Sequence, residues 1–289
     1  MKLPDVGPIV DLVSLVLHTG GLKGRRPVSA LLCAVPDSGK TVWIMGRFTE
    51  NTGIHRAEVI TRIGTARWLL QGRRWEKYHH LIVPDLTTSL AGGSGSAEGL
   101  QSFLMGLVYE GIKDYHTLHL SHLDLDKPVT IGVVAGIVPT TLHRRRKDWA
   151  ATGFLRRFLP ISYSYTAEQT ASTNLLCLDG MNRKPPPISL NYQLWNQVIT
   201  PPARISRSLA SVADGVAYAC DIGREKGGGN TIREMLHSLV LAHALRRGSV
   251  VADGSDVAAI IRLSKYINYN MQQVPTLYNL YEDPEVEDI

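Results

Sequence analysis

The sequence has little cysteine, no long apolar run and no strong excess of charge. Its three cysteines, Cys33, Cys177 and Cys220, are widely spaced and odd in number, which argues against a disulfide framework and against a CxxC metal site. No stretch approaches the roughly 20 apolar residues of a membrane span, and the N-terminus has neither the basic start nor the cleavage site of a signal peptide. We therefore expect a cytoplasmic protein with no membrane association.

The composition is that of a folded protein. At 289 residues and 44% hydrophobic content, the chain can bury a substantial core as one large domain, or as one domain with a smaller satellite. The net charge of +5 permits an anionic partner, but it is too modest to establish nucleic-acid binding.

A short run at positions 34–41, AVPDSGKT, matches the phosphate-binding loop pattern G-x-x-x-x-G-K-[ST] in all but its first residue. Such a loop joins a strand to a helix, and its backbone N–H groups converge on phosphates. The apolar run 28–33 supplies the strand, and residues 41–45 can begin the helix. Lys40 would reach the β- and γ-phosphates of ATP, and the Thr41 hydroxyl would bind Mg²⁺. The residues expected to bind the nucleotide are Pro36, Asp37, Ser38, Gly39, Lys40 and Thr41.

Alanine stands at position 34, where the pattern has glycine. A methyl group is tolerated there if the φ of Ala34 is negative, and Pro36 and Gly39 still supply the turn. A chance turn after a strand would explain the same residues without a ligand. The Gly-Lys-Thr tripeptide favours the phosphate loop, because it lies in the required strand–loop–helix setting.

An acidic residue follows the second apolar run, 78–85, which ends at Asp85. A carboxylate at a strand end beside bound phosphates is suited to support Mg²⁺. Many ATPases have a glutamate next, which polarises the attacking water, but here the next residue is Leu86. Hydrolysis would then be slow, or its base would come from elsewhere. The alternative is an ordinary strand-end aspartate before a Thr-Thr-Ser turn.

The order of elements predicts an α/β fold. Apolar strands are expected at 28–33, 78–85 and 129–138, with helical stretches between them, including 100–112, so we expect an α/β sandwich around a parallel sheet. After the prolines at 185–187 and 201–202, strands disappear. A helix is predicted from a capping box at Thr231 to Gly248, and another over about 256–268. The predicted units are an N-terminal helical segment (1–27), a phosphate-loop core (28–200), a helical unit (201–270) and an acidic tail (271–289).

Two further positions could carry chemistry. The strand 129–138 is followed by Thr140, whose hydroxyl could touch a γ-phosphate or an attacking water. The segment 153–161 holds Arg156 and Arg157 in an apolar frame, which suits an arginine acting on the nucleotide of a neighbouring subunit. Surface arginines flanking a core strand would give the same pattern.

The order of these motifs resembles that of the AAA+ ATPases, over about residues 28–268. It is most similar to the ATPase module of minichromosome-maintenance helicases, in which a G-L-L-S-R-F segment carries the arginine finger, matched here by Arg157 before Phe158. Their lid helix opens with T-x-R-Q-L-E and continues toward A-H-A-R-x-R, matched here by Thr231, Arg233 and residues 242–247.

This resemblance implies a P-loop NTPase fold, a three-layer sandwich with a parallel sheet followed by a small all-helical lid. It implies ATP and Mg²⁺ as ligands and a ring, a hexamer, in which Arg157 acts on the adjacent subunit. Arg233 would be the second sensor arginine, and Thr140 would stand at the first sensor, where the family usually has Asn. The implied function is a helicase-like motor or a replication or recombination factor acting on DNA, and the divergence suggests a phage or another mobile element.

Two other functional classes fit the same residues. Leu86 favours an ATP-switched helicase loader or filament-forming regulator with little hydrolysis. The modest net charge leaves room for a remodeller of a protein client.

Three minor patterns favour simpler interpretations. His116, His119 and His122 lie in an expected extended segment, where they would not share a face, so a metal site is disfavoured. The basic run 143–147 could contact nucleic-acid phosphates or a subunit boundary, although a solvated face is more common. Residues 91–96 could face a central pore or form a plain surface linker.

Overall fold

The computed structural model describes residues 3–71, 74–91, 94–117, 120–178, 185–201, 205–220 and 228–277. Its centre is a parallel sheet of five strands. In spatial order these are β3 (Ile54–Arg56), β4 (His80–Val83), β7 (Gly132–Ile137), β2 (Ala30–Cys33) and β8 (Leu159–Ser162). Every residue of β2, β4, β7 and β8 is buried, as expected for parallel strands covered on both faces. The predicted α/β fold with a parallel sheet is confirmed.

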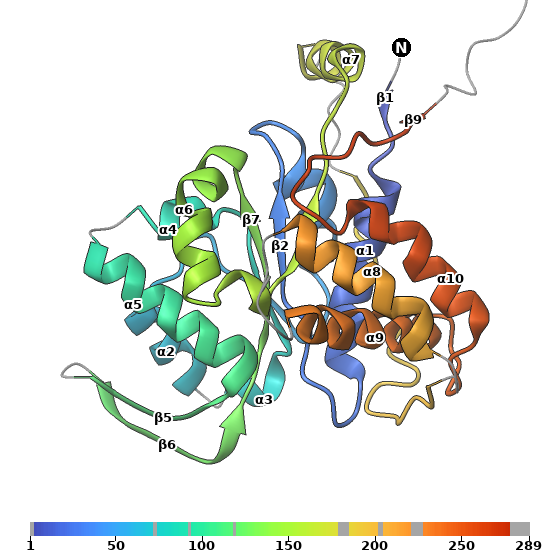
Figure 1. Ribbon diagram of the computed structural model, residues 1–289. Helices are drawn as coiled ribbons and strands as arrows, with labels where there is room; N and C mark the ends of the chain where they lie inside the picture. The colour runs from blue at the N-terminus through green and yellow to red at the C-terminus, as the bar shows by residue number, and fades with distance from the viewer. Residues whose placement is uncertain are drawn as a thin grey trace, which may run out of the picture.

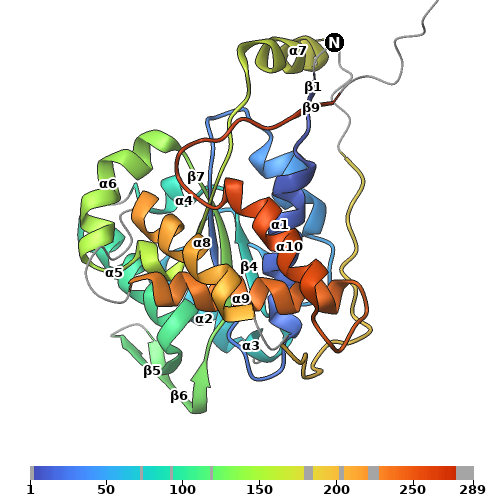
Figure 2. The same ribbon diagram turned by 45° about the vertical axis from the view of Figure 1, so that its right-hand side comes forward.

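Helices cover both faces of this sheet (Figure 1). On one side lie α2 (Arg62–Leu70), α4 (Leu86–Ser89), α5 (Ser94–Met105) and α6 (Pro139–Ala151), with the short α3 (Arg74–Lys77) below. On the other side lie α1 (Gly7–His18), α8 (Ile205–Ala219), α9 (Gly228–Arg246) and α10 (Gly254–Leu263). Figure 2 shows α8, α9 and α10 in front of the sheet. Because α9 packs against α1, α8 and α10, the N-terminal helix and the C-terminal helices share one core.

The boundaries of the C-terminal helices differ from the prediction. The capping box predicted at Thr231 is wrong, because α9 is already helical at Gly228. A capping box does occur at α10, where Asp253 accepts from the N–H of Ser255 and Asp256 accepts from the N–H of Asp253. The predicted end of α9 is confirmed, since Gly248 has a φ of 77° directly after it.

The region between β4 and β7 holds an unpredicted hairpin, β5 (Ile112–Thr117) and β6 (Leu120–Val129). The expected strand 129–138 was therefore wrong at its start, since Val129 belongs to β6 and β7 begins at Gly132. The expected helix 100–112 ends as α5 at Met105, followed by a π-helical turn over 106–110. The side chains of His116 and His122, and all of His119, lie outside the described part of the chain.

Both ends of the described chain meet in a small second sheet. β1 (Leu3–Pro4) pairs antiparallel with β9 (Thr276–Leu277), so the expectation of no strands after residue 201 was wrong. Between α7 (Ala167–Leu178) and α8, residues 185–201 run as an extended segment along the core. The N–H of Ile188 in this segment donates to the carbonyl of Arg47. The segment thereby carries the chain to the face covered by α1 and α9.

Two cysteines can be placed. Cys33, at the end of β2, and Cys220 are buried free thiols, and burial raises the pKa of Cys33 to about 12. The side chain of Cys177 lies outside the described part. Across the described ranges, no helix is both long enough and apolar enough to span a bilayer.

Candidate functional site

The loop after β2 has the backbone geometry of a phosphate nest. Gly39 has a φ of 78° and Asp37 a φ of 59°, so left-handed residues alternate with right-handed neighbours and turn successive N–H groups to one side. Ala34 is buried and does not have a positive φ, so its methyl group is accommodated in place of glycine. The Lys40 ammonium, almost fully buried, donates to the carbonyls of Ala34 and Val35 at 2.7 and 2.9 Å. The loop is therefore closed over its own lysine.

The helix that follows the loop is irregular. Residues Lys40–Ile44 form a π-helical turn, and Met45–Phe48 continue as a 3₁₀ helix. The expectation of an ordinary helix after the loop was wrong in this respect. π-helical turns are rare and occur often at functional sites. Thr41 lies half-buried in this turn, one residue after Lys40.

Asp85 lies two residues beyond the end of β4 and caps α4. Its carboxylate accepts from the N–H of Thr87 at 2.8 Å and from the Thr88 hydroxyl at 2.7 Å. Partial burial acts to raise the pKa of Asp85, but these hydrogen bonds outweigh it and hold the pKa below its usual value. An ionised carboxylate at this position is suited to support Mg²⁺. The next residue, Leu86, is completely buried and supplies no base.

The sheet register brings these groups to one edge. Cys33 of β2 pairs with Ile137 of β7, and Val83 of β4 pairs with Ala135, so the loop, Asp85 and Thr140 all follow the carboxyl ends of neighbouring strands. Thr140 is exposed in the first turn of α6, directly after β7. Burial lowers the pKa of Lys40, while Cys33, Asp85 and Asp37 act in the opposite direction. Asp85 is thus close enough to act on the charge of Lys40.

A cleft of about 470 Å³ opens beside the loop. Residues 37–43 line one side of it, and Thr173 and Asn174 of α7 line the other. The sequence gave no sign that α7 faces the loop, since no motif marks it. The loop is also held from behind by Tyr163 and Tyr165, which follow β8. The alternation Ser-Tyr-Ser-Tyr at 162–165, typical of an extended chain with tyrosines on one face, could have indicated them.

Arg157 lies at the opposite edge of the sheet from the loop. It ends the 3₁₀ turn Leu155–Arg157 before β8, whose Leu159 pairs with Ala30 at the start of β2. At roughly 3.3 Å per residue, the backbones of Arg157 and the first loop residue are about 20 Å apart. The Arg157 side chain is 10% exposed and donates to the Gly153 carbonyl and to Glu110. Within the described residues, its Nε has no hydrogen-bond partner.

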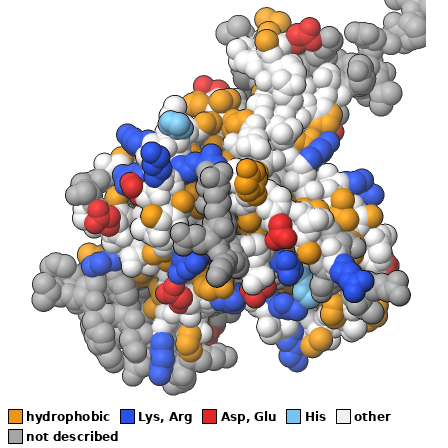
Figure 3. Space-filling view, viewed as in Figure 1, with side chains coloured by type: hydrophobic (Ala, Val, Ile, Leu, Met, Phe, Trp, Pro, Cys, Tyr) orange, Lys and Arg blue, Asp and Glu red, His pale blue; other side chains and the backbone are white. Residues whose placement is uncertain are grey.

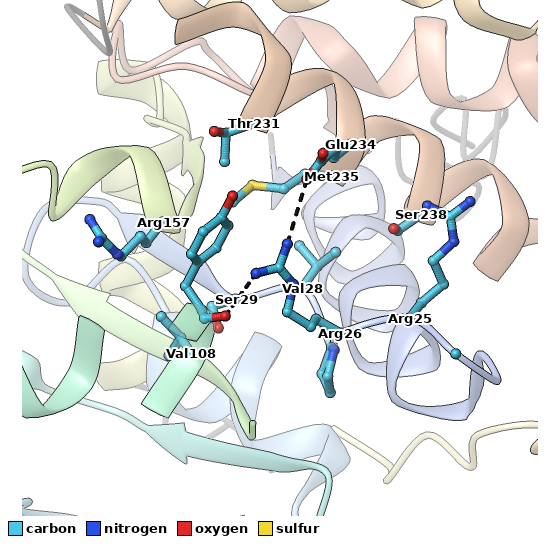
Figure 4. Close-up of a pocket in the computed structure, with 13 residues that line it drawn as sticks. Arg25, Arg26, Val28, Ser29, Val108, Arg157, Thr231, Glu234, Met235 and Ser238 are labelled. Atoms are coloured by element: carbon cyan, nitrogen blue, oxygen red, sulfur yellow. Dashed lines mark hydrogen bonds and ion pairs between the residues drawn. The ribbon is translucent and has the colours of Figure 1, made fainter. Parts of the chain in front are cut away.

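Arg233 lies on α9, away from the residues that line the loop cleft. Its guanidinium is 3.8 Å from the carboxylate of Asp214 on α8. The same helix faces Arg157 across a cavity of about 240 Å³, to which it contributes Thr231, Glu234 and Ser238 (Figure 4). The structure therefore brings the helix of Arg233 to Arg157, and brings neither arginine to the loop of the same chain.

The cavity between α9 and the core contains a second basic group. Arg26 donates to the carbonyl of Tyr109 at 2.7 Å and lies 3.9 Å over its ring. Its other nitrogen is 3.7 Å from Glu234, as the dashed line in Figure 4 indicates. Arg26 was not singled out in the sequence, where it appears only within a basic loop. It joins the core to α9.

The basic run on α6 has two kinds of side chain. Arg145 and Arg146 turn inward, and their guanidinium groups donate to the carbonyls of Leu90 and Ala219. His143, Arg144 and Lys147 are exposed. Figure 3 shows basic side chains gathered over α6 on one face of the molecule. Only part of the run is therefore available to an external partner.

Comparisons with known proteins add little. No protein-family model and no curated protein matches the sequence. Among solved structures, the chain is similar to a proposed ATPase from Cytophaga hutchinsonii, with a TM-score of 0.47 and 14% identity, over 96% of this chain and 84% of that one. A likeness at this level is too weak to establish a function.

Proposed function

We propose that this protein binds ATP with Mg²⁺ and hydrolyses it, as a divergent AAA+ ATPase. One observation carries the proposal: a loop with left-handed Asp37 and Gly39 and a buried Lys40 shares one edge of a parallel sheet with the ionised Asp85. Backbone N–H groups, a lysine and a carboxylate together are what a magnesium-bound triphosphate requires.

Each residue has a role in this proposal. Lys40 leaves the carbonyls of Ala34 and Val35 and binds the β- and γ-phosphates, while Thr41 and Asp85 hold the metal. Bound Mg²⁺ would neutralise charge on the phosphate oxygens during transfer. Thr140 orients the γ-phosphate or the attacking water. Because Leu86 is buried where a glutamate would act as base, we propose that turnover is slow.

A ring, with a hexamer as the proposed form, would complete the site. Arg157 cannot reach the loop of its own chain from the opposite edge of the sheet, so we propose that it acts on the nucleotide of an adjacent subunit. Arg233 lies on the helix that faces Arg157 and would sense the γ-phosphate of a bound nucleotide as the C-terminal helices move as a lid. Supporting this, Arg157 is already held beside a cavity that contains other basic groups.

The client in this proposal is DNA, acted on by a helicase-like motor or by a replication or recombination factor. A second candidate is an ATP switch, such as a helicase loader or filament-forming regulator, which the buried Leu86 favours. A remodeller of a protein partner is the third candidate.

Steady-state ATPase assays and equilibrium ATP binding test the proposal, with and without single- and double-stranded DNA. Lys40→Ala is expected to abolish ATP binding, and Asp85→Asn to keep binding while turnover falls at least about 100-fold. Unchanged binding and turnover in Lys40→Ala would refute it. DNA stimulation supports the motor, tight binding without turnover supports the switch, and indifference to DNA supports a protein client. Imaging the particle with ATP bound distinguishes a ring, a spiral and a monomer.

A further inference from the structure

Two tyrosine hydroxyls converge on one carbonyl of the phosphate loop. Tyr163 donates to the Ser38 carbonyl at 2.8 Å, and Tyr165 donates to the same oxygen at 2.6 Å. A carbonyl oxygen has two lone pairs, and here each is used by a phenol. Tyr163 is completely buried, Tyr165 is half-buried, and Ser38 is 2% exposed. The contact is therefore shielded from water.

The chain after β8 places both rings on the loop. The N–H of Tyr163 donates to the carbonyl of Cys33, which continues the pairing of β8 with β2 for one residue. In an extended chain, alternate side chains point to the same face, so Tyr163 and Tyr165 face the loop together. Ser164, between them, points away and donates to the carbonyl of Met271 at 2.6 Å. The C-terminal segment thus holds the same stretch from its other side.

The held carbonyl belongs to the peptide that joins Ser38 to Gly39. A trans peptide is planar, and its C=O and N–H point in opposite directions. Fixing the Ser38 carbonyl against the two phenols therefore fixes the Gly39 N–H on the other side of the loop, away from the tyrosines. Gly39, with a φ of 78°, could otherwise adopt several conformations at little cost. The phenols remove that freedom.

We propose that Tyr163 and Tyr165 are positioning residues that hold the Ser38–Gly39 peptide in the orientation that binds phosphate. The inference rests on the proposed ATP binding and deepens it. Both phenols remain donors over the physiological range, because burial raises the pKa of Tyr163 and of Tyr165 well above 10. The pair is redundant, since either phenol alone can hold the carbonyl. Removing both would let the peptide turn and would leave its oxygen buried without a partner.

The test compares Tyr163→Phe, Tyr165→Phe and the double variant with the unaltered protein. Measurements are the Kd for ATP, the KM and kcat of hydrolysis, and the thermal unfolding midpoint. We expect each single variant to weaken ATP binding about 3-fold or less, and the double variant about 10-fold or more, with the change in KM and little change in kcat. This excess over the product of the single effects is the signature of a shared acceptor.

Tyr192→Phe is the matched control. Its hydroxyl also donates to a backbone carbonyl, that of Thr52 at 2.8 Å, but remote from the loop. It should leave the Kd for ATP unchanged. Equal ATP binding by the double variant and the unaltered protein would overturn the inference while leaving ATP binding itself intact. Failure of the unaltered protein to bind ATP would instead overturn the proposed function. If the double variant does not fold, Tyr165→Phe decides: an unchanged Kd contradicts the inference, and a weakened one at an unchanged unfolding midpoint supports it.

Discussion

Arg157 donates to the carboxylate of Glu110, 2.5 Å away, at the base of the β5–β6 hairpin. Glu110 is followed by Gly111, whose φ of 84° turns the chain into β5. The arginine proposed to act between subunits is therefore bound to the start of a hairpin in its own chain. To meet a phosphate in another subunit, Arg157 must release Glu110 or move together with it.

Mixing two inactive variants tests whether Arg157 acts on a neighbour. Lys40→Ala loses ATP binding, and Arg157→Ala is expected to keep binding while turnover falls about 1,000-fold. A mixed assembly contains sites with an intact loop from one variant and an intact arginine from the other. We therefore expect ATPase activity to return on mixing, measured at constant total protein. No recovery in assemblies shown by native mass spectrometry to be mixed would contradict the trans role.

Glu110→Gln separates the two roles of Arg157 in that experiment. It removes the negative charge and keeps an oxygen that can accept from the guanidinium, so we expect turnover to be retained within about 3-fold. A loss as large as that in Arg157→Ala would mean that the arginine acts through the hairpin of its own chain.

The buried carboxylate of Asp256 should contribute strongly to stability. It accepts from His243 at 2.6 Å and from two nitrogens of Arg247 at 2.9 Å. Burial acts to raise the pKa of Asp256, but these partners hold it below its usual value. Removing one member of a buried ion pair leaves the others uncompensated, so Asp256→Ala should lower the free energy of unfolding by about 3 kcal/mol. Urea denaturation measures it.

Asp253→Ala is the control for that variant. It removes the same kind of side chain from the same helix start, but Asp253 is half exposed and caps α10 through the N–H of Ser255. Loss of a cap should cost about 1 kcal/mol. Equal losses in the two variants would show that the buried cluster adds nothing beyond the cap.

Local patterns were sufficient to predict the loop and the carboxylate, and insufficient to predict what surrounds them. The residues of the loop are contiguous, and Asp85 follows a strand that is apolar throughout, so both leave a signature in a short window. The contacts of Tyr163 with Ser38 and of Arg157 with Glu110 depend on how distant segments meet. Strand order has the same origin: nothing local indicates that β7 lies between β2 and β4.

The close approach of β7 and β4 makes Gly136 sensitive to substitution. A Cβ at Gly136 would lie 2.1 Å from the carbonyl of Pro84, the residue before Asp85. Gly136→Ala should push the two strands apart, lower the free energy of unfolding by about 1–3 kcal/mol and reduce ATP turnover. Gly215→Ala on α8, where a Cβ meets nothing within 4 Å, should instead stabilise by about 0.5–1 kcal/mol. Both follow from denaturation and ATPase assays, and a neutral Gly136→Ala would contradict the first.

Buried histidines should make the fold sensitive to mild acid. Burial lowers the pKa of His18 and of His79 to about 4, against 6.5 in an unfolded chain. His18 already donates to the Ser14 carbonyl and accepts from the N–H of Asn191, so a second proton would face a donor. Between pH 6.5 and 4 the unfolded state binds more protons. Each histidine should therefore cost about 1.4 kcal/mol of stability per pH unit as the pH falls through that window.

Urea denaturation at pH 7.5, 6.0 and 5.0 measures this slope. Above about pH 6.5 the contribution of these histidines should be constant, and below about pH 4 it should level off. In His79→Gln, the loss of stability between pH 6 and 5 should be smaller by about 1.4 kcal/mol. An unchanged slope in that variant would show that His79 takes up its proton without unfolding.

The exposed basic side chains of α6 offer a direct test of DNA as the client. Arg144 and Lys147 are exposed and three residues apart on one helix face. If they contact phosphates, Arg144→Glu with Lys147→Glu should weaken DNA binding at low salt and lower the salt dependence of the affinity by about 2 contacts. ATP binding without DNA should not change. The exposed pair Arg262 and Lys265, at the same spacing on the opposite side of the sheet, is the matched control. Equal losses from both charge reversals would show that only net charge attracts DNA, whereas a loss confined to α6 would place the nucleic acid over the helix that begins at Thr140.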